Sequence, residues 1–216
     1  MTRDGTVIRE SAGDRDCPHD SRLPGDLITL LTGARIALPD IDLYAVATGP
    51  GSFTGLRIGI ATMQGLAFAA GKPLIGVSGF DALAQIASRN AVRQTRAPAV
   101  ATWVDAWRGD VFAARYQHHV QIDPPTVEKP AALLARITGS TLFIGDAVPQ
   151  YGDLIRRTLG DRALFADPPA PSLAATIAHI ATRTARTGAQ SAPDDIRALY
   201  IRRPDAELAR DARPVR

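Results

Sequence analysis

The sequence predicts an α/β fold in two lobes. Short apolar runs typical of strands alternate with segments whose apolar residues recur at helical spacing, and this alternation occurs twice along the chain. A polar connection at residues 91–97 separates the two runs, so we expect a first lobe at residues 1–90 and a second lobe with a C-terminal tail at residues 91–216. Of the 216 residues, 45% are apolar and 22% are charged, which excludes a disordered chain and allows a buried core.

Composition also excludes several classes of protein. The most apolar stretch, residues 58–70, is broken by polar side chains and is shorter than the ~20 residues that cross a bilayer, so we expect no membrane contact. Residues 1–20 are polar and lack the pattern of a secretory signal, and the single Cys17 offers no internal disulfide, so we expect a cytoplasmic protein. Six Arg against four acids in residues 195–216 supply +2 of the net charge of +3, so a general nucleic-acid surface is not expected.

The first lobe is predicted to begin with a strand at residues 6–10, directly after an Asp-Gly turn. A loop at residues 17–22 is expected next. A helix at residues 23–32 follows, because leucines recur there at helical spacing and Gly33 is a stop signal. The same patterns predict the remaining elements of this lobe: strands at residues 43–47 and 74–77, and helices at residues 54–70 and 80–89.

The second lobe is predicted to open with a β-hairpin, because β-rich runs at residues 99–105 and 111–117 flank a short turn. A proline-containing loop is expected at residues 124–130. The remaining elements of this lobe are strands at residues 141–144 and 163–166, and helices at residues 131–137, 148–159 and 172–186.

A glycine-rich loop at residues 49–55 joins a predicted strand to a predicted helix. Such a junction presents free backbone N–H groups at the positive end of the helix dipole, which suits an anion. The loop lacks the Gly-Lys-Ser/Thr of a P-loop, however, and Pro50 removes a donor that a dinucleotide-binding loop needs. A tight turn that requires small residues is the alternative explanation.

The helix after this loop carries Gly55, Gly59 and Thr62 along one side. A glycine in a helix interior costs roughly 1 kcal/mol relative to alanine, so two glycines at this spacing need a reason. Close approach of a second helix is the simplest one, with the closest contact at Gly55 and Gly59. The spacing leaves open whether that second helix belongs to this chain or to a partner.

Residues 47–59, Ala-Thr-Gly-Pro-Gly-Ser-Phe-Thr-Gly-Leu-Arg-Ile-Gly, closely resemble the bacterial TsaB family. The similarity extends to the hairpin at residues 105–112, the Gly-Asp-Ala turn at residues 145–147, the Tyr-Ile-Arg at residues 200–202 and the helix start at residues 17–31. It therefore covers essentially the whole chain. The resemblance implies the two-lobe fold that is shared by actin, sugar kinases and heat-shock ATPases.

The resemblance also implies a function. The chain would be a non-catalytic dimerisation and scaffold subunit of the complex that transfers a threonylcarbamoyl group to the adenosine beside the anticodon of tRNA. Its expected partners are a TsaD-like paralogue, which would carry the catalysis, and a TsaE-like ATPase in the larger complex. A homodimer of the free chain is left open, and tRNA would be contacted only through the complex. No cofactor and no metal are expected.

In that family two first-lobe helices build the pairing surface, here residues 23–32 and 54–70. The residues that we expect at this surface are Leu27, Leu30, Leu31, Gly51, Ser52, Phe53, Gly55, Gly59, Thr62, Met63 and Leu66. An anion contact is also considered, and its residues are Ser52, Thr54 and Arg108.

No catalytic residue is expected in this chain. His118 and His119 are adjacent and would point to opposite faces of a strand, whereas the metal-binding paralogue uses two histidines one helical turn apart. Trp107 and Arg108 place bulk at a hairpin turn where active relatives need small residues. The alternatives are a self-standing glycoprotease-like peptidase or ATP-dependent phosphotransferase of the same fold, and a tRNA-binding module that acts through the Arg202-Arg203 pair.

The start of the chain departs from the family pattern. Family members carry two strands before the Asp-Gly turn, and here we expect the first lobe to lack both, as in a truncated version of the family's protein. The strand at residues 6–10 would then have no hairpin mate, and the strand at residues 43–47 would have an open edge. Residues 1–20 are expected to pack poorly, and the first lobe to be less stable than the second.

Overall fold

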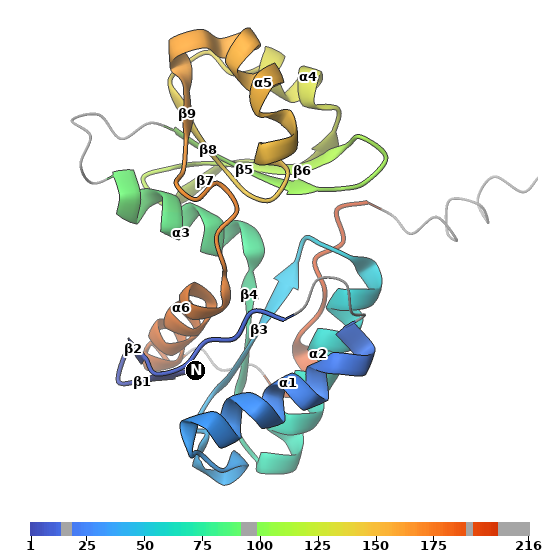
Figure 1. Ribbon diagram of the computed structural model, residues 1–216, viewed down its shortest axis with the longest axis vertical. Coiled ribbons are helices and arrows are strands. Elements are labelled where there is room, and N and C mark those ends of the chain that lie inside the picture. The colour runs from blue at the N-terminus through green and yellow to red at the C-terminus, as the bar shows by residue number, and fades with distance from the viewer. Residues whose placement is uncertain (14–18, 92–98, 189–191, 203–216) are drawn as a thin grey trace, which may run out of the picture.

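The structure, a computed structural model, describes residues 1–13, 19–91, 99–188 and 192–202. Its elements form two stacked parts, each with a sheet of its own, which Figure 1 shows one above the other. Strands and helices alternate along the chain in both parts. The prediction of an α/β fold is therefore confirmed.

The lower part is built on two parallel strands, β3 (Tyr44–Gly49) and β4 (Leu74–Ser78). Helix α2 (Phe53–Ala70) covers one face of this pair and helix α6 (Ala174–Arg186) covers the other. Parallel strands are usually buried on both faces in this way. The core residues are Tyr44, Val46, Ile60, Ala67, Leu74 and Ile196 on the α2 side, and Ile75, Val77, Ala82, Ile177 and Ala181 on the α6 side.

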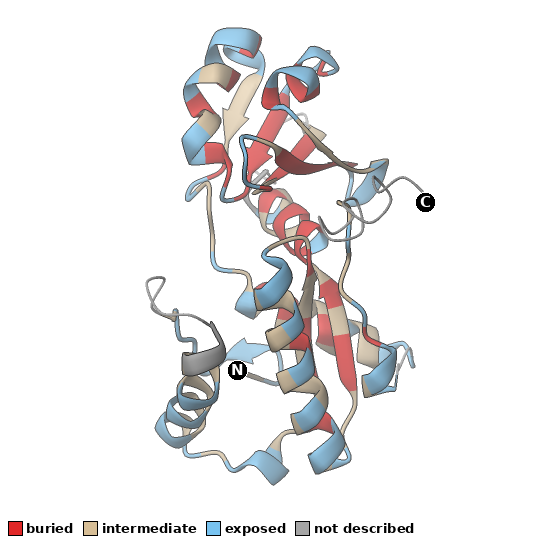
Figure 2. Cartoon of the chain, turned by 90° about the vertical axis from the view of Figure 1, so that its right-hand side faces the viewer, coloured by how far each residue is buried: buried red, intermediate tan, exposed pale blue. Residues whose placement is uncertain are grey.

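Helix α1 (His19–Ala34) lies beside α2, and the 3-10 helix η1 (Leu38–Asp40) leads from it into β3. Figure 2 shows buried residues in both sheets and in α3, but none in the part of α1 that it colours. α1 is therefore an outer layer that rests on α2.

The upper part is a five-stranded sheet in the order β7-β6-β5-β8-β9, in which β5 is antiparallel to β6 and parallel to β8. Its strands are β5 (Ala99–Asp105), β6 (Val111–Gln117), β7 (Val120–Glu128), β8 (Thr141–Ile144) and β9 (Ala163–Phe165). One face packs on α4 (Pro130–Ala135) and α5 (Val148–Leu159), and the other packs on α3 (Gly79–Ala91). The 3-10 helix η2 (Gly160–Arg162) precedes β9.

Three segments of the described ranges connect the two parts. Helix α3 directly follows β4 yet packs on the upper sheet, where the Tyr116 hydroxyl donates a hydrogen bond to Asp81 Oδ1 at 2.7 Å. Helix α6 comes late in the sequence yet covers the lower strands. Residues 192–202, which we call the C-terminal strap, begin with the 3-10 helix η3 (Pro193–Asp195) and run from the lower part to the upper one (Figure 1). The boundary expected at residue 90 stays a prediction.

The loop predicted at residues 17–22 is wrong, because α1 already begins at His19. The expected start relied on Pro24 lying in the first turn, where a proline is best tolerated because the first four N–H groups have no intrahelical partner. Pro24 instead lies inside the helix. Cys17 falls outside the described residues.

The loop predicted at residues 124–130 is also wrong, since β7 continues to Glu128. Prolines are accepted in a strand when it lies at the edge of a sheet or at a bulge, because no ladder hydrogen bond is then lost. Both conditions hold here: β7 is the edge strand, and its pairing with β6 shifts register between Ala113 and Arg115.

Two further expectations need correction. His118 and His119 lie in the turn between β6 and β7, with φ of 50° and 65°, and not in a strand. The strand predicted at residues 6–10 is limited to β2 (Thr6–Val7), and it does have a hairpin mate, β1 (Thr2–Arg3). The Asp-Gly turn between them has φ of 50° and 78°, the positive values that a two-residue hairpin loop requires.

We expect Gly145→Ala to lower the free energy of unfolding by about 3 kcal/mol or more. Gly145 has φ of 130°, and a Cβ there would lie 2.0 Å from the carbonyl oxygen of Trp103, so strain and a backbone clash would add. Chemical denaturation measures the change. Gly139→Ala is the control, because nothing lies within 4 Å of a Cβ at Gly139. Equal midpoints for the two variants would contradict the prediction.

Candidate functional site

The glycine loop turns the chain sharply from β3 into α2. Gly49 has φ of 110°, and a Cβ there would lie 2.9 Å from Leu56 Cδ1 and 3.3 Å from the carbonyl oxygen of Leu199. Any other residue would be strained there and would push against the strap. Ser52 then caps α2, because its Oγ accepts a hydrogen bond from the backbone N–H of Gly55 at 3.3 Å. These features meet the requirements of a tight turn.

The two glycines on the side of α2 have no packing role within the described chain. Beyond the helix's own backbone, no heavy atom of the described residues lies within 4 Å of a Cβ built at Gly59. At Gly55 the nearest atoms belong to Ser52, at 3.5 Å. Helix α1 lies beside α2, and none of its described atoms lies within 4 Å of a Cβ at either position. The close helix approach that the glycines permit is therefore open to a partner.

Helix α1 leaves much of its apolar surface uncovered. Leu27, Leu30 and Leu31 are only half-buried, and Ile28 is 65% exposed. From residue 22 onward, where its side chains are described, none is buried. An amphipathic helix normally buries its apolar stripe against a core. The apolar side chains of α1 are only partly covered by the described residues.

The other residues expected at the pairing surface divide into two groups. Met63 and Leu66 pack against the core beneath α2, so they serve the internal packing of the chain. Gly51 and Thr62 are half-buried, and Phe53 is exposed. The structure thus brings the expected residues onto α1, α2 and the adjoining loop, and their contact with a partner stays a prediction.

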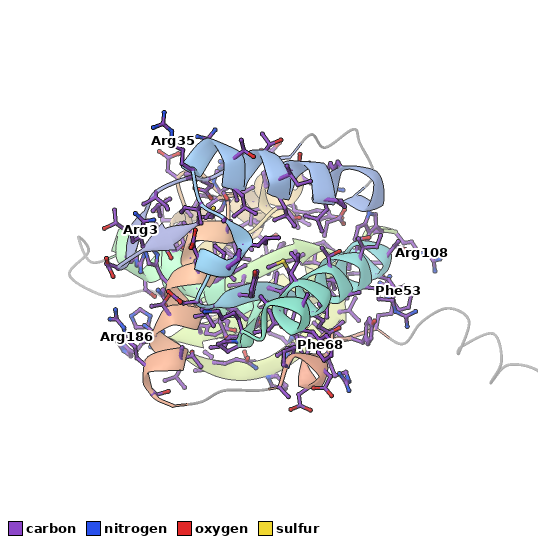
Figure 3. All side chains as sticks on the ribbon, turned by 90° about the horizontal axis from the view of Figure 1, so that it is seen from below. Arg3, Arg35, Phe53, Phe68, Arg108 and Arg186 are labelled. Atoms are coloured by element: carbon purple, nitrogen blue, oxygen red, sulfur yellow. The ribbon has the colours of Figure 1, made fainter. Side chains whose placement is uncertain are left out.

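Aromatic side chains stand at both ends of α2. At its start the Arg57 guanidinium carbon lies 3.9 Å from the ring centre of Phe53, and Arg57 Nε donates a hydrogen bond to the Tyr200 hydroxyl at 3.0 Å. The Phe53 and Tyr200 ring centres are 5.3 Å apart. Near the end of the helix Phe68 is 84% exposed, and Figure 3 shows it on the side of α2 turned away from α1. We did not expect Arg57 or Tyr200 at this surface from the sequence.

The C-terminal strap holds the glycine loop and α2 in place. Gln64 Nε2 donates hydrogen bonds to the carbonyl oxygens of Pro193 at 2.7 Å and Ile196 at 3.2 Å. The backbone N–H of Leu199 donates to the carbonyl oxygen of Thr48 at 2.7 Å. Ile196 is itself buried in the core beneath α2. Residues near the end of the described chain thereby fix the strand end from which the loop starts.

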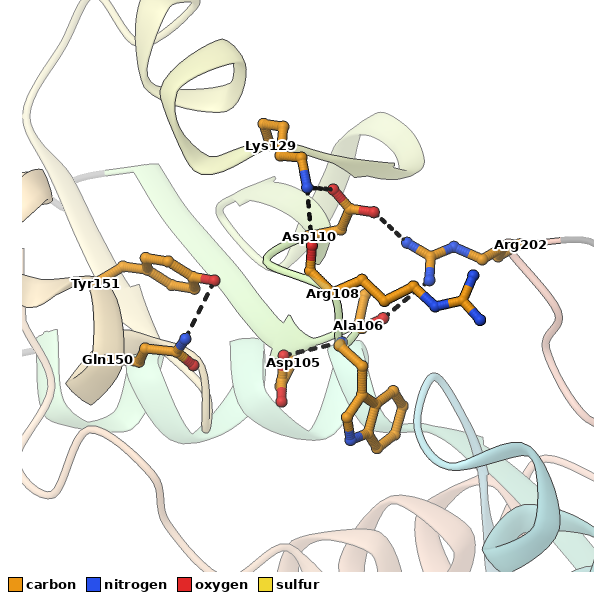
Figure 4. A network of polar contacts seen from close by, with 9 residues as sticks. Asp105, Ala106, Arg108, Asp110, Lys129, Gln150, Tyr151 and Arg202 are labelled. Atoms are coloured by element: carbon orange, nitrogen blue, oxygen red, sulfur yellow. Dashed lines mark hydrogen bonds and ion pairs between the residues drawn. The ribbon is translucent and has the colours of Figure 1, made fainter.

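The strap then reaches the turn of the β5–β6 hairpin. Arg202 pairs with Asp110 at 2.5 Å and donates a hydrogen bond to the carbonyl oxygen of Ala106 at 3.0 Å (Figure 4). Lys129 Nζ contacts the second oxygen of Asp110 at 2.8 Å and donates to the carbonyl oxygen of Arg108 at 2.8 Å. The hydrogen bond from Lys129, together with the positive charges of Lys129 and Arg202, lowers the pKa of Asp110.

Two carboxylates hold the backbone of the hairpin, Asp105 from within it and Asp146 from the turn after β8. Asp105 Oδ1 accepts a hydrogen bond from the backbone N–H of Trp107 at 2.9 Å, and Asp146 Oδ1 accepts one from the N–H of Asp105 at 2.9 Å. Desolvation and the nearby Asp105 charge raise the pKa of Asp146. Trp107 and Arg108 have φ of 56° and 55°, and Trp107 is 50% exposed, so bulky side chains stand at this turn as the sequence indicated.

The anion contact considered at Ser52, Thr54 and Arg108 stays a prediction. Ser52 and Thr54 lie at the start of α2, where Ser52 Oγ already caps the helix. Arg108 lies on the hairpin of the upper part, and the strap runs between the two places.

Within the described ranges, no group of three or more His, Cys, Asp and Glu side chains is placed to hold a metal ion. No helix in the described part of the chain is long and apolar enough to cross a membrane. Arg203, the second arginine of the proposed tRNA-binding pair, lies outside the described residues.

Comparison with known proteins identifies the family. Residues 16–199 match the family model described as TsaD, tRNA N6-adenosine threonylcarbamoyltransferase. The chain belongs to this TsaD/TsaB glycoprotease-like family. It is 42% identical over 119 residues to the tRNA threonylcarbamoyladenosine biosynthesis protein TsaB of Escherichia coli (strain K12). The aligned residues make up 54% of this chain and 48% of that protein. The resemblance to TsaB found in the sequence is thereby confirmed.

Two more relatives extend the comparison. The chain is 32% identical over 198 residues to the uncharacterized protein ML0378 of Mycobacterium leprae (strain TN). The aligned residues make up 91% of this chain and 48% of that protein. The chain thus spans about half the length of these two curated relatives. A crystal structure from Pseudomonas aeruginosa, described as an uncharacterized protein with similarity to peptidase YEAZ, superposes with a TM-score of 0.65 and 28% identity over 86% of this chain and 85% of that one.

We expect Asp110→Asn to destabilise this TsaB-like chain at pH 7, and the difference from the parent to shrink as the pH falls below about 4. The pKa of Asp110 is lower in the folded chain than its ordinary value of 3.8, so its stabilising contribution is present above that value and is lost as the pH falls through the folded-state pKa. Urea denaturation at a series of pH values measures this difference.

Asp153→Asn is the matched control, because Asp153 forms an ion pair with Arg156 at 3.3 Å while its side chain is 84% exposed. Such exposed pairs contribute little to stability, so this variant should follow the parent at every pH. A destabilisation by Asp110→Asn that is the same at pH 3 as at pH 7 would contradict the prediction.

Proposed function

We propose that the chain is a non-catalytic dimerisation and scaffold subunit of the complex that transfers a threonylcarbamoyl group to the adenosine beside the anticodon of tRNA. Membership of the TsaD/TsaB family supports the proposal, as does the match to a protein named for tRNA threonylcarbamoyladenosine biosynthesis. The observation that carries it is the side of α2 at Gly55 and Gly59, where no atom of another described element lies within 4 Å of a Cβ built at either glycine.

Within the chain alone, the glycines on this side of α2 are unfavourable. In an open position of a helix, alanine would be more favourable than glycine by roughly 1 kcal/mol, and nothing within the described chain prevents an alanine at Gly59. A partner helix that packs closely against α2 supplies the missing reason. The half-buried leucines of α1 and the exposed Phe53 extend this surface with apolar area that a partner would cover.

We propose a TsaD-like paralogue as the partner in a heterodimer, with catalysis in that paralogue. A TsaE-like ATPase would join the larger complex. The chain would contact tRNA only as part of that complex. A homodimer through the same surface is the alternative for the free chain. The proposal includes the two-lobe arrangement of the actin and sugar-kinase fold, with lobes at residues 1–90 and 91–216, and a cytoplasmic location.

A self-standing peptidase or phosphotransferase of the same fold is the second candidate. The superposed Pseudomonas protein is described as similar to a peptidase, which favours this candidate. The polar groups at the hairpin turn favour the scaffold, because Asp105 is used on its own backbone and Asp110 is held between two cations. Groups engaged in this way are poorly placed to take part in a reaction.

We expect Gly59→Leu to weaken binding to the TsaD-like paralogue of the same cell by ten- to hundredfold. A leucine at this position would hold the facing helix away, and overpacking of this kind costs roughly 1–3 kcal/mol. The lone chain should fold normally, since a Cβ at Gly59 meets only open space. Calorimetric titration and co-purification with the paralogue measure the change.

Gly65→Leu is the matched control, because Gly65 is exposed on a different side of α2 and a Cβ there also meets nothing within 4 Å. This variant should bind the paralogue like the parent. Normal binding by Gly59→Leu, or loss of its fold, would show that the glycines serve internal packing.

We expect the isolated chain to turn over neither ATP nor peptides above the background of the buffer. Release of phosphate from ATP and cleavage of a mixed peptide library measure the two activities. ATP turnover that vanishes in Asp105→Ala would establish the enzyme alternative in place of the scaffold.

A further inference from the structure

Three exposed arginines lie on one side of the lower part, outside the α1–α2 surface. Arg183 and Arg186 are in the last turn of α6, and Arg3 is in β1. Helix α6 covers the face of the β3–β4 pair that is opposite to α2. Figure 3 shows Arg3 and Arg186 on the same side of the molecule. We call these three arginines the basic patch.

A hydrogen bond holds the β1–β2 hairpin on α6. His179 Nε2 donates it to the carbonyl oxygen of Gly5 at 2.7 Å, and Gly5 lies in the turn that follows Arg3. His179, Arg183 and Arg186 are spaced at i, i+4 and i+7, so they lie along one side of the helix. The turn beside Arg3 is therefore fixed on the side of α6 that carries the other two arginines.

Within the described residues, no carboxylate forms an ion pair with an arginine of the basic patch. Arginines of the upper sheet differ in this respect. Arg115 pairs with Asp123 at 3.0 Å, and Arg136 pairs with Glu128 at 2.6 Å. The positive charges of the patch are thus left without a direct partner.

Two acids belong to the same N-terminal segment as Arg3. Asp4 lies in the hairpin turn and offsets one of the three positive charges. Glu10 is held toward the other end of α6, where it accepts a hydrogen bond from Ser172 at 2.6 Å. An excess of positive charge therefore remains at the patch, although the net charge of the whole chain is only +3.

The helix dipole explains only part of this arrangement. Arginines in the last turn of a helix complement its dipole, which accounts for Arg183 and Arg186 but not for Arg3 of the neighbouring hairpin. Side chains three residues apart on a helix have Cβ atoms about 5–6 Å apart, so their guanidinium groups can contact neighbouring groups of one polyanion. The guanidinium fork matches the geometry of phosphate oxygens.

We propose that the basic patch contacts the phosphate backbone of tRNA when the chain is part of its complex. The charge of the patch favours a polyanion, and the choice of tRNA rests on the proposed function. Phosphate contacts position a nucleic acid without reading its sequence. Three such contacts give weak binding by the lone chain, which agrees with a subunit that holds tRNA only together with its partners.

Fluorescence anisotropy of a labelled tRNA transcript, titrated with the full chain at several salt concentrations, tests this contact. We expect a dissociation constant of about 50 µM at about 30 mM salt. The logarithm of the binding constant should fall with the logarithm of the salt concentration with a slope between about −2 and −3, because each phosphate contact contributes about −0.7 to −0.9. Arg183→Gln combined with Arg186→Gln should weaken binding about tenfold at about 30 mM salt and bring the slope to about −1.

Arg156→Gln combined with Arg157→Gln is the matched control, because it removes the same two charges from the last turn of α5 in the upper part. This variant should keep the slope of the parent. Arg183→Lys combined with Arg186→Lys keeps the charge at the patch and should also retain the slope. The lysine variant thereby separates the charge of these side chains from their packing.

The proposal is wrong if the parent chain at about 500 µM does not bind tRNA at about 30 mM salt, or if the two glutamine variants share one slope. Phosphatidylserine vesicles that bind the parent as tightly as tRNA does, and that are released by Arg183→Gln with Arg186→Gln, would assign the patch to a membrane and also overturn it. The test needs no paralogue, so it is independent of the scaffold proposal. Arg183→Gln with Arg186→Gln should bind the paralogue like the parent, and Gly59→Leu should bind tRNA like the parent.

Discussion

The Asp110 carboxylate, held between Lys129 and Arg202, fixes the C-terminal strap, one of the segments that connect the two parts of the molecule. Through Arg202 it anchors the end of the strap on the upper part. Along the same strap Leu199 binds the last residues of β3, and Ile196 fills the core beneath α2. Displacement of the strap would therefore loosen the hairpin, the glycine loop and the lower core together.

The hairpin turn needs this support because its backbone is unfavourable by itself. Trp107 and Arg108 both have φ near 55°, a left-handed conformation that costs roughly 1–2 kcal/mol for each residue with a side chain. The Asp105 carboxylate accepts a hydrogen bond from Trp107, and Lys129 donates one to the carbonyl oxygen of Arg108. Polar contacts from outside the turn thus stabilise a conformation that its own residues do not favour.

Local patterns in the sequence predict most of the elements, because periodicity and turn signals act over a few residues. The helix at residues 54–70 and the hairpin around residues 106–110 follow from such patterns. The ion pair of Asp110 with Arg202 does not, since 92 residues separate them and neither shows any local sign of the other. β7 was missed for another reason: its two prolines indicate a loop, and only its place at the sheet edge makes them acceptable.

In the candidate site, too, local patterns predict some features, whereas contacts between distant residues emerge only from the fold. The positions of Gly55 and Gly59 on one side of a helix follow from spacing, but whether α1 covers them depends on how far apart the two helices pack. Arg57 and Tyr200 were missed because their contact joins α2 to the distant strap. The Tyr-Ile-Arg at residues 200–202 was noted only as part of the resemblance, and its role in holding the hairpin emerges from the fold.

The half-exposed state of α1 has a thermodynamic consequence for any assembly through this surface. Leu27, Leu30 and Leu31 still contact water in the free chain, as does the large side chain of Ile28. A partner that covers them removes apolar surface from water, and burial of such surface lowers the heat capacity of the system. Association would then become more enthalpy-driven as the temperature rises, so the strength of the complex would follow a curve with temperature and not a straight line.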